Sequence, residues 1–264
     1  MSRIINTNTI GPITLRVSDN PLTITATGKV TATGAGNAGI YGGSGTAWRI
    51  TNAGTVTSSG GLGITLRRGG TVQNGLASGS TALISGSTAG IGIYGAAGNV
   101  TNYGSISGSY GVLLNAGGTV TNTAAAAITG SNIGIDVLHG TGTVSNAGAI
   151  TGTSKYGVAL TQGGTVTNSG SIVGYTGIGL RSGGTVTNSA TGRIGATGLK
   201  GTGIFSTGTA GSITNAGSIA GVTGRYFVRP AVVPEDTAKY AQAPGHSTSR
   251  SPRFMRSTQG ANDS

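Results

Sequence analysis

The 264-residue chain contains no cysteine, 6 prolines and 5 acidic residues. Without cysteine, neither disulfide bonds nor thiol chemistry can contribute to its stability or function. Charged residues make up 8% of the chain, and no apolar run approaches the length of a membrane-spanning helix. Two acids, Asp19 and Asp136, precede residue 225, and several repeats separate them. They therefore cannot form the carboxylate pair of a glycosidase.

Glycine is abundant instead, with 53 residues, and serine and threonine accompany it. This composition is compatible with disorder or with collagen. However, valine, isoleucine and leucine recur at regular short intervals, which argues against disorder. Glycine has no strict three-residue period, which argues against collagen.

One phrase, GGTVTN, organises the chain and ends at Asn122, Asn168 and Asn188. Looser copies end at other asparagines, and the successive steps between them are 22, 28, 20, 24, 22, 20 and 27 residues. A repeat of this length cannot bury its own apolar side chains, so neighbouring repeats must stack. The looser copies surround Asn52, Asn74, Asn102, Asn146 and Asn215.

Each repeat contains three short segments in which apolar and polar residues alternate, as in strands. We therefore predict an all-β fold, a right-handed parallel β-helix with coils of roughly 20–28 residues and three short strands per coil. The corners are expected at residues that tolerate a left-handed backbone. In the repeat after residue 163 these are Asn168, Gly170, Gly174, Gly177 and Gly183.

Stacking predicts three inward columns of aliphatic side chains and one column of asparagines. We interpret the asparagine column as a structural amide ladder, in which each amide donates to the next coil. The first aliphatic column contains Val56, Val72, Val100, Val120, Val144, Val166, Val186 and Ile213. The second contains Ile84, Ile106, Ile128, Ile150, Ile172, Ile194 and Ile219. The third includes Ile64/Leu66, Ile91/Ile93, Val112/Leu114, Ile135/Val137, Val158/Leu160, Ile178/Leu180 and Ile204.

The domain prediction has three parts: an N-terminal strand or cap at 1–20, the β-helix at 21–224, and a tail at 225–264. The tail is basic, bears proline and serine, contains no copy of the phrase, and is predicted to be disordered. Longer steps predict corner insertions near Ala77–Ser87 and Ala196–Gly203. Trp48, the single tryptophan, is interpreted as a local packing plug and not as a carbohydrate platform.

The phrase G-G-T-V-T-N-x-G-x-I, followed by G-I/V-x-L, resembles the passenger repeats of bacterial autotransporters and filamentous-haemagglutinin-like adhesins. The resemblance implies a non-catalytic, surface-displayed stalk or adhesin outside a Gram-negative cell. It implies contact with glycans or other surfaces, or self-association through open solenoid ends. Two features of the family have no counterpart in these residues: the export signal and the C-terminal outer-membrane barrel. The barrel is the part through which the family reaches the membrane. We therefore expect a truncated or frameshifted reading frame.

A β-helix polysaccharide enzyme is the first alternative. It would need converging acid and base side chains. Asp136 and His139 are the nearest candidates, and no third partner accompanies them. We therefore expect no enzyme activity and no catalytic, cofactor-binding or metal-binding residues.

Ice binding is the second alternative, because paired outward threonines would stack on one face. These pairs are Thr55/Thr57, Thr119/Thr121, Thr165/Thr167 and Thr185/Thr187, and the interruptions are Arg49, Gln73, Asn99 and Ser145.

The net charge of +11 raises the question of nucleic acid. The cations are scattered, and no basic stripe with interleaved aromatic residues is present. Arg67, Arg68 and Arg181 are predicted to share one corner. Asn115, His139 and Gln162 are predicted to interrupt that corner, so we expect no nucleic-acid partner.

Overall fold

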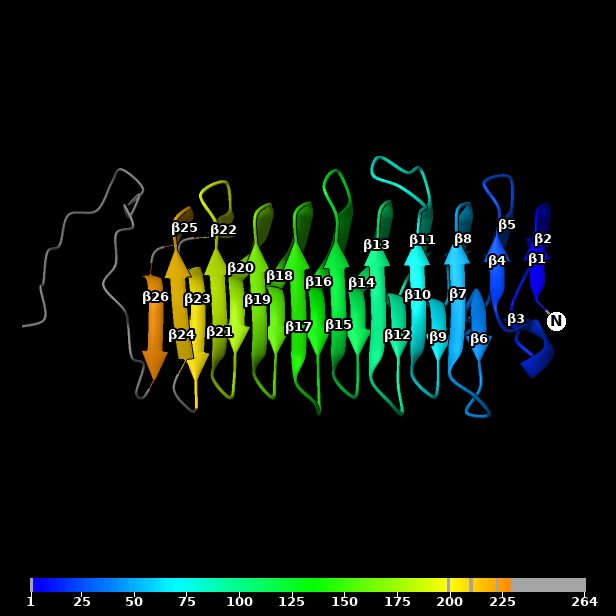
Figure 1. Cartoon of the computed structure of the whole chain (residues 1–264), viewed down its shortest axis with the longest axis horizontal. Coiled ribbons are helices and arrows are strands. Elements are labelled where there is room, and N and C mark those ends of the chain that lie inside the picture. Colours follow the sequence, from blue (N-terminus) through cyan, green and yellow to red (C-terminus); the bar gives the residue numbers. More distant parts are fainter. Residues whose placement is uncertain (1, 199, 209–210, 222, 229–264) are drawn as a thin grey trace, which may run out of the picture.

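The computed structural model describes residues 2–198, 200–208, 211–221 and 223–228, which form one parallel β-solenoid of ten coils (Figure 1). The predicted all-β parallel solenoid is thereby confirmed. Within the described residues the single helical element is a 3₁₀ turn at Val17–Asp19. Each coil contributes its first strand to a ten-stranded sheet and its remaining strands to a sixteen-stranded sheet.

The ten-stranded sheet is regular, and its strand pairings contain no register shift from the fourth coil onward. Val166, for example, lies between Val144 and Val186 of the neighbouring coils. The strands in spatial order are β1 (Arg3–Ile5), β4 (Leu22–Ile24), β7 (Trp48–Asn52), β10 (Gly70–Asn74), β13 (Gly98–Asn102), β15 (Gly118–Asn122), β17 (Gly142–Asn146), β19 (Gly164–Asn168), β21 (Gly184–Asn188) and β24 (Gly211–Asn215).

The sixteen-stranded sheet begins with separate second and third strands, which pair with the same strands of neighbouring coils. The second strands are β2 (Asn8–Ile10), β5 (Lys29–Ala32), β8 (Thr55–Ser58) and β11 (Leu83–Gly86), and later β22 (Arg193–Ala196) and β25 (Ser218–Ala220). The third strands are β3 (Ile13–Thr14), β6 (Ile40–Gly42), β9 (Leu62–Leu66) and β12 (Ala89–Ile93), and later β23 (Thr202–Thr207) and β26 (Thr223–Val228).

In the four central coils the second and third strands are continuous, which corrects the prediction of three separate strands in every coil. A shift in register replaces the expected corner, as between Gly130 and Ile133. Because the backbone ladder continues through this bend, the two predicted sheets are one. The four strands are β14 (Ser105–Leu114), β16 (Ala127–Val137), β18 (Ala149–Leu160) and β20 (Ser171–Leu180).

The core consists of the predicted aliphatic columns. Val166, Ile172 and Ile178 are all fully buried. One assignment is wrong: Val56 pairs with Ile84 and so belongs to the second column, whereas Ile50 is the neighbour of Val72. The GTVT phrase around Val56 lies on β8, a second strand, although in other coils the same phrase lies on a first strand. The phrase alone therefore does not distinguish the two strands of a coil.

The predicted asparagine ladder is confirmed and extends over eight coils. Each Nδ2 donates to the Oδ1 of the next asparagine, at distances of 2.7–2.9 Å. The Nδ2 atom of Asn168 also donates to the carbonyl oxygens of Gly170 and Arg193, at 3.1 and 3.2 Å. All members are buried, and the ladder runs through Asn52, Asn74, Asn102, Asn122, Asn146, Asn168, Asn188 and Asn215.

The role predicted for the corner residues is corrected. Of the five residues predicted for one repeat, Gly183 has a left-handed backbone, with φ of 71°. Gly177 is needed for close packing instead: a Cβ atom there would lie 2.5 Å from the carbonyl oxygen of Gly203 and 2.7 Å from Cγ2 of Ile194. The equivalent glycines on other coils meet the same two kinds of atom, at Gly39, Gly63, Gly90, Gly111, Gly134 and Gly157.

The predicted boundaries also change. Of the two alternatives predicted for 1–20, a strand or a cap, the structure has strands: residues 3–14 form the first coil of the solenoid, which pairs with the second. The final strand β26 pairs with β23 and ends at Val228, four residues beyond the predicted end of the solenoid. The insertions are corner loops between β10 and β11 and between β22 and β23. The tail predicted to be disordered covers 225–264; this prediction is wrong for 225–228, which belong to β26, and the rest of the tail lies outside the described residues.

Candidate functional site

Asp136 lies on the outer surface of β16, between the inward side chains of Ile135 and Val137. Alternation along a strand directs its carboxylate away from the core. Its exposed fraction is nevertheless 8%. Its neighbours on adjacent coils are Leu113 and Ala159. The outer face of the sheet therefore holds a largely buried carboxylate.

Two cations from later coils act on this carboxylate. Burial raises the pKa of the Asp136 carboxyl to about 6, while the positive charges of Lys155 and Arg181 oppose this rise. Lys155 belongs to β18, and Arg181 follows β20 directly. Among the described residues, the Asp136 carboxylate has no ion pair and no hydrogen bond. The ion pair found among these residues joins Arg3 and Asp19. The carboxylate is therefore available to accept hydrogen bonds from a ligand.

Tyrosine rings pack on the same outer face. A Cβ atom at Gly179 would lie 2.6 Å from Cε1 of Tyr156, so this glycine makes room for the ring. The Nζ atom of Lys155 lies 5.9 Å from the centroid of the Tyr156 ring. At an earlier coil Arg67 lies 4.8 Å from the centroid of the Tyr94 ring. Burial raises the pKa of Tyr94 above its usual value, and the charge of Arg67 offsets part of this rise. Asp136, Lys155, Arg181 and Tyr156 are called the Asp136 recess below.

His139, the partner suggested by the sequence, does not contribute to the electrostatics of Asp136. It lies in a corner loop with a left-handed φ of 49°. Its Nδ1 atom is 3.1 Å from the carbonyl oxygen of Asn115. Burial is the main cause of the raised pKa of Asp136, and the charges that act on it are those of Lys155 and Arg181, which sequence reasoning did not connect to it. The available signal was the coil period, which places both residues on the same face one and two coils later.

The predicted corner of Arg67, Arg68 and Arg181 is also rearranged. Backbone hydrogen bonds from Tyr94, Asn115, Leu138, Thr161 and Arg181 to the preceding coil place these residues in one column with Arg67. His139 and Gln162 belong to the next position along the chain, beside Arg68. The column of cations is therefore interrupted, as predicted, although largely by different residues.

Trp48 is the packing plug that the sequence predicted. It is 3% exposed, and its Nε1 atom donates to the carbonyl oxygen of Gly43 at 2.6 Å. Its indole packs against Gly42, where a Cβ atom would lie 2.6 Å from the ring. A shallow cavity of about 290 Å³ lies beside Trp48 and Asn20. Because the ring is buried, it offers no flat surface to a sugar.

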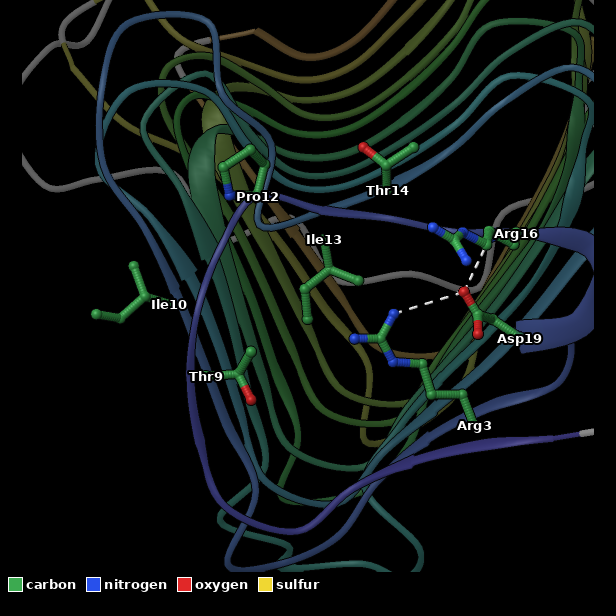
Figure 2. Close-up of a pocket in the computed structure, with 8 residues that line it drawn as sticks. All are labelled: Arg3, Thr9, Ile10, Pro12, Ile13, Thr14, Arg16 and Asp19. Carbon is green, nitrogen blue, oxygen red and sulfur yellow. Dashed lines mark hydrogen bonds and ion pairs between the residues drawn. The ribbon is translucent and has the colours of Figure 1, made fainter.

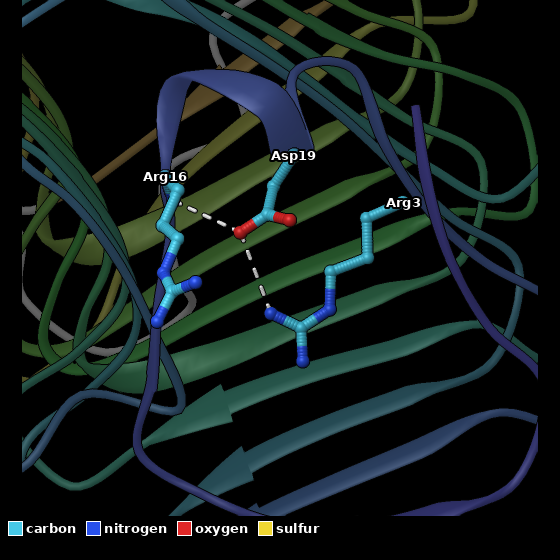
Figure 3. Close-up of polar contacts among 3 residues, drawn as sticks. All are labelled: Arg3, Arg16 and Asp19. Atoms are coloured by element: carbon cyan, nitrogen blue, oxygen red, sulfur yellow. Dashed lines mark hydrogen bonds and ion pairs between the residues drawn. The ribbon is translucent and has the colours of Figure 1, made fainter. Parts of the chain in front are cut away.

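The N-terminal end of the solenoid contains a second cavity, of about 450 Å³, over Ile13 (Figure 2). Asp19 accepts hydrogen bonds from the backbone N–H of Arg16 at 2.9 Å and from the guanidinium of Arg3 at 3.5 Å (Figure 3). Arg3 and Asp19 thus form a polar cover beside the end of the aliphatic stack. The Arg3 and Asp19 side chains remain 37% and 17% exposed, so the cavity is open to solvent.

No cluster of three or more histidine or acidic residues that could hold a metal ion is found in the described part of the chain. A search of the same residues for a helix long and apolar enough to cross a membrane also finds none. Comparison with protein-family models, with curated proteins and with solved structures finds no match to this chain.

Proposed function

We propose that this chain is a non-catalytic β-solenoid stalk of the adhesin type, similar to autotransporter passenger repeats, that is displayed at a cell surface and contacts glycans. One observation supports the proposal: ten coils stack through parallel strands along one rod, which holds equivalent positions of successive coils in columns on its outer surface. The aliphatic columns and the amide ladder make neighbouring coils mutually dependent. A rod of this kind is suited to hold a contact surface at a distance from its attachment point.

The Asp136 recess is the contact that we assign to a glycan. A carboxylate without a protein partner accepts hydrogen bonds from sugar hydroxyl groups. Lys155 and Arg181 donate to sugar oxygens, and the ring of Tyr156 offers a face to C–H groups. Because the recess holds one carboxylate, it has a donor and acceptor set for binding but not the carboxylate pair of a glycosidase.

Binding of the full chain to immobilised oligosaccharides tests this proposal, with neutral and uronic acid chains as separate arms. Arg181→Ala should weaken binding, because it removes a cation from the recess. Arg193→Ala is the matched control, because it removes an exposed arginine from β22, which pairs with the opposite end of β20. An equal loss of binding in both variants would mean that binding depends on net charge and not on the Asp136 recess. A folded chain that binds no glycan would contradict the proposal.

Release of new reducing ends from the same glycans distinguishes a stalk from an enzyme. We expect none from the wild-type chain. Glycan cleavage by the wild-type chain that disappears in Asp136→Asn would contradict the non-catalytic stalk and favour a β-helix polysaccharide enzyme.

Self-association through the first coil is a further part of the proposal. Strands β1, β2 and β3 pair on one side among the described strands, so their other edges remain open. Ile4 and Ile10 are 63% and 85% exposed on this coil. Light scattering should detect association that Ile10→Lys weakens, and an association unaffected by this change would place the contact elsewhere.

A further inference from the structure

The outer face of the ten-stranded sheet carries a regular array of hydroxyl groups over its last five coils. Each of these strands has two outward positions, and every one of the ten positions holds threonine or serine. The pairs in coil order are Thr119/Thr121, Thr143/Ser145, Thr165/Thr167, Thr185/Thr187 and Ser212/Thr214. These ten residues are called the hydroxyl face below.

Sequence reasoning misplaced the start of this array. Thr55 and Thr57 lie on β8, which belongs to the other sheet. The interrupting residues Arg49, Gln73 and Asn99 precede the hydroxyl face and lie in the third to fifth coils. Ser145 keeps a hydroxyl in its place. The array is therefore continuous, and its interruptions are confined to the coils that come before it.

The side chains of the hydroxyl face have no hydrogen-bond partner among the described residues, so their hydroxyl groups are free to bind water. All ten are partly or fully exposed, and none of the ten positions is charged. The absence of a register shift between these strands keeps equivalent hydroxyls aligned from coil to coil. The face therefore presents ordered hydroxyl groups to solvent.

The spacing of the array follows from strand geometry. Neighbouring parallel strands lie about 4.8 Å apart, and alternate residues of one strand lie roughly 6.6 Å apart. The resulting two-dimensional grid approximates oxygen spacings on planes of hexagonal ice. Threonine also adds a methyl group beside each hydroxyl, and its β-branch restricts the side-chain rotamers. Both features favour an ordered layer of water over the face.

We propose that the hydroxyl face binds ice. Water molecules held by the free hydroxyls and arranged around the methyl groups match the ice surface and freeze to it. A charged residue in the grid would instead hold a hydration shell with a different geometry. This activity is separate from the glycan contact, because the hydroxyl face and the Asp136 recess lie on different sheets.

Ice recrystallisation and thermal hysteresis, measured on the full chain, test the inference. The wild-type chain should slow recrystallisation and shape ice crystals. Thr165→Lys should abolish both effects, because it places a charged side chain in the middle of the array. Thr129→Lys is the matched control, since Thr129 is an exposed threonine on β16 of the other sheet, and it should retain full activity.

Circular dichroism and urea midpoints establish that each variant is folded. Thr143→Lys, on the preceding coil, provides a second variant should Thr165→Lys fail to fold. The inference is overturned by a folded wild-type chain without activity, or by equal activity in the wild-type and the folded lysine variants of the hydroxyl face. Loss of ice activity together with intact glycan binding would separate this inference from the proposed function.

Discussion

Replacement of Asn168 by aspartate tests the amide ladder at its centre. The Nδ2 atom of Asn168 donates to three oxygens, on Gly170, Asn188 and Arg193, at 2.8–3.2 Å. Its Oδ1 atom accepts from Asn146 at 2.8 Å. Aspartate has nearly the same shape but, when ionised, has no proton to donate. The change therefore places a buried carboxylate against three acceptor oxygens.

The magnitude follows from these contacts. The Nδ2 group has two protons, which the three contacts share; at about 1 kcal/mol for each net hydrogen bond, their loss lowers the free energy of unfolding by about 2 kcal/mol. Burial of an unpaired carboxylate adds a further cost of about 3 kcal/mol. The sum is comparable with the entire stability of many domains, which is roughly 5–15 kcal/mol. Asn168→Ala loses these bonds and the bond accepted from Asn146 but introduces no charge, so it should cost about 3 kcal/mol.

The two variants differ in their dependence on pH. The buried aspartate at position 168 should have a pKa above its unfolded value of about 3.9. Its penalty is therefore absent below that value and grows as the pH rises through the folded-state pKa. Below the folded-state pKa, the protonated carboxyl can also donate one hydrogen bond to Asn188. The alanine variant has no such group, so its destabilisation relative to wild type should not change with pH.

Urea unfolding followed by circular dichroism at pH 4 and pH 7 provides the assay. Asn168→Asp should have a lower midpoint than Asn168→Ala at pH 7, and the order should narrow or reverse at pH 4. Thr167→Ala, an exposed change at the next residue, should alter stability by no more than about 0.5 kcal/mol. An aspartate variant as stable as wild type at pH 7 would refute the ladder as a stabilising element.

Three further changes probe other parts of the structure. Gly157→Ala should lower stability by more than about 2 kcal/mol, because its Cβ atom would lie 2.7 Å from both the Gly177 carbonyl oxygen and Cγ2 of Ile172. Gly195→Ala, where the nearest atom would be 3.7 Å away, should be tolerated, and equal urea midpoints for the two would contradict this packing. Val166→Asp should prevent folding or lower the melting temperature by more than about 10 °C, because it buries a carboxylate in the aliphatic stack, and a melt within a few degrees of wild type would refute its inward position. Asp136→Asn should stabilise the chain at pH 7 by up to about 3 kcal/mol and have little effect near pH 4. The carboxyl of Asp136 has a pKa of about 6 in the folded state instead of 3.8, so the wild-type chain loses stability as the pH rises between these values. An Asn variant whose gain in stability does not depend on pH would contradict the raised pKa.

The sequence predicted the solenoid well because each coil repeats a simple pattern of alternating residues. Val166, Ile172 and Asn168 all occupy the predicted positions, since period-2 alternation and the coil period together determine both face and neighbour. It failed at Val56, where two similar segments within one coil compete for the same alignment. It also failed at the bend between second and third strands, because a bend in a continuous strand and a true corner both require glycine.

The candidate sites were less predictable. The burial of an outward carboxylate at Asp136 depends on its surroundings in the stacked coils, which no local pattern encodes. Its electrostatic neighbours lie 19 and 45 positions later in the sequence, as the numbers of Lys155 and Arg181 show. The continuity of the hydroxyl face likewise required the pairing register, because Thr55 carries the same local phrase on a different sheet.

The ladder, the hydroxyl face and the Asp136 recess all depend on the stacking of coils in register. Distances between pairs of spin labels test this stacking most directly, and the absence of native cysteine allows labels to be placed at single chosen pairs. Thr71→Cys paired with Thr165→Cys spans four coils, and the same label paired with Ser212→Cys spans six. The backbones at these positions should lie roughly 19 and 29 Å apart at about 4.8 Å per coil. Two narrow distance distributions that differ by about two coil spacings would support the account, and broad or equal distributions would contradict it.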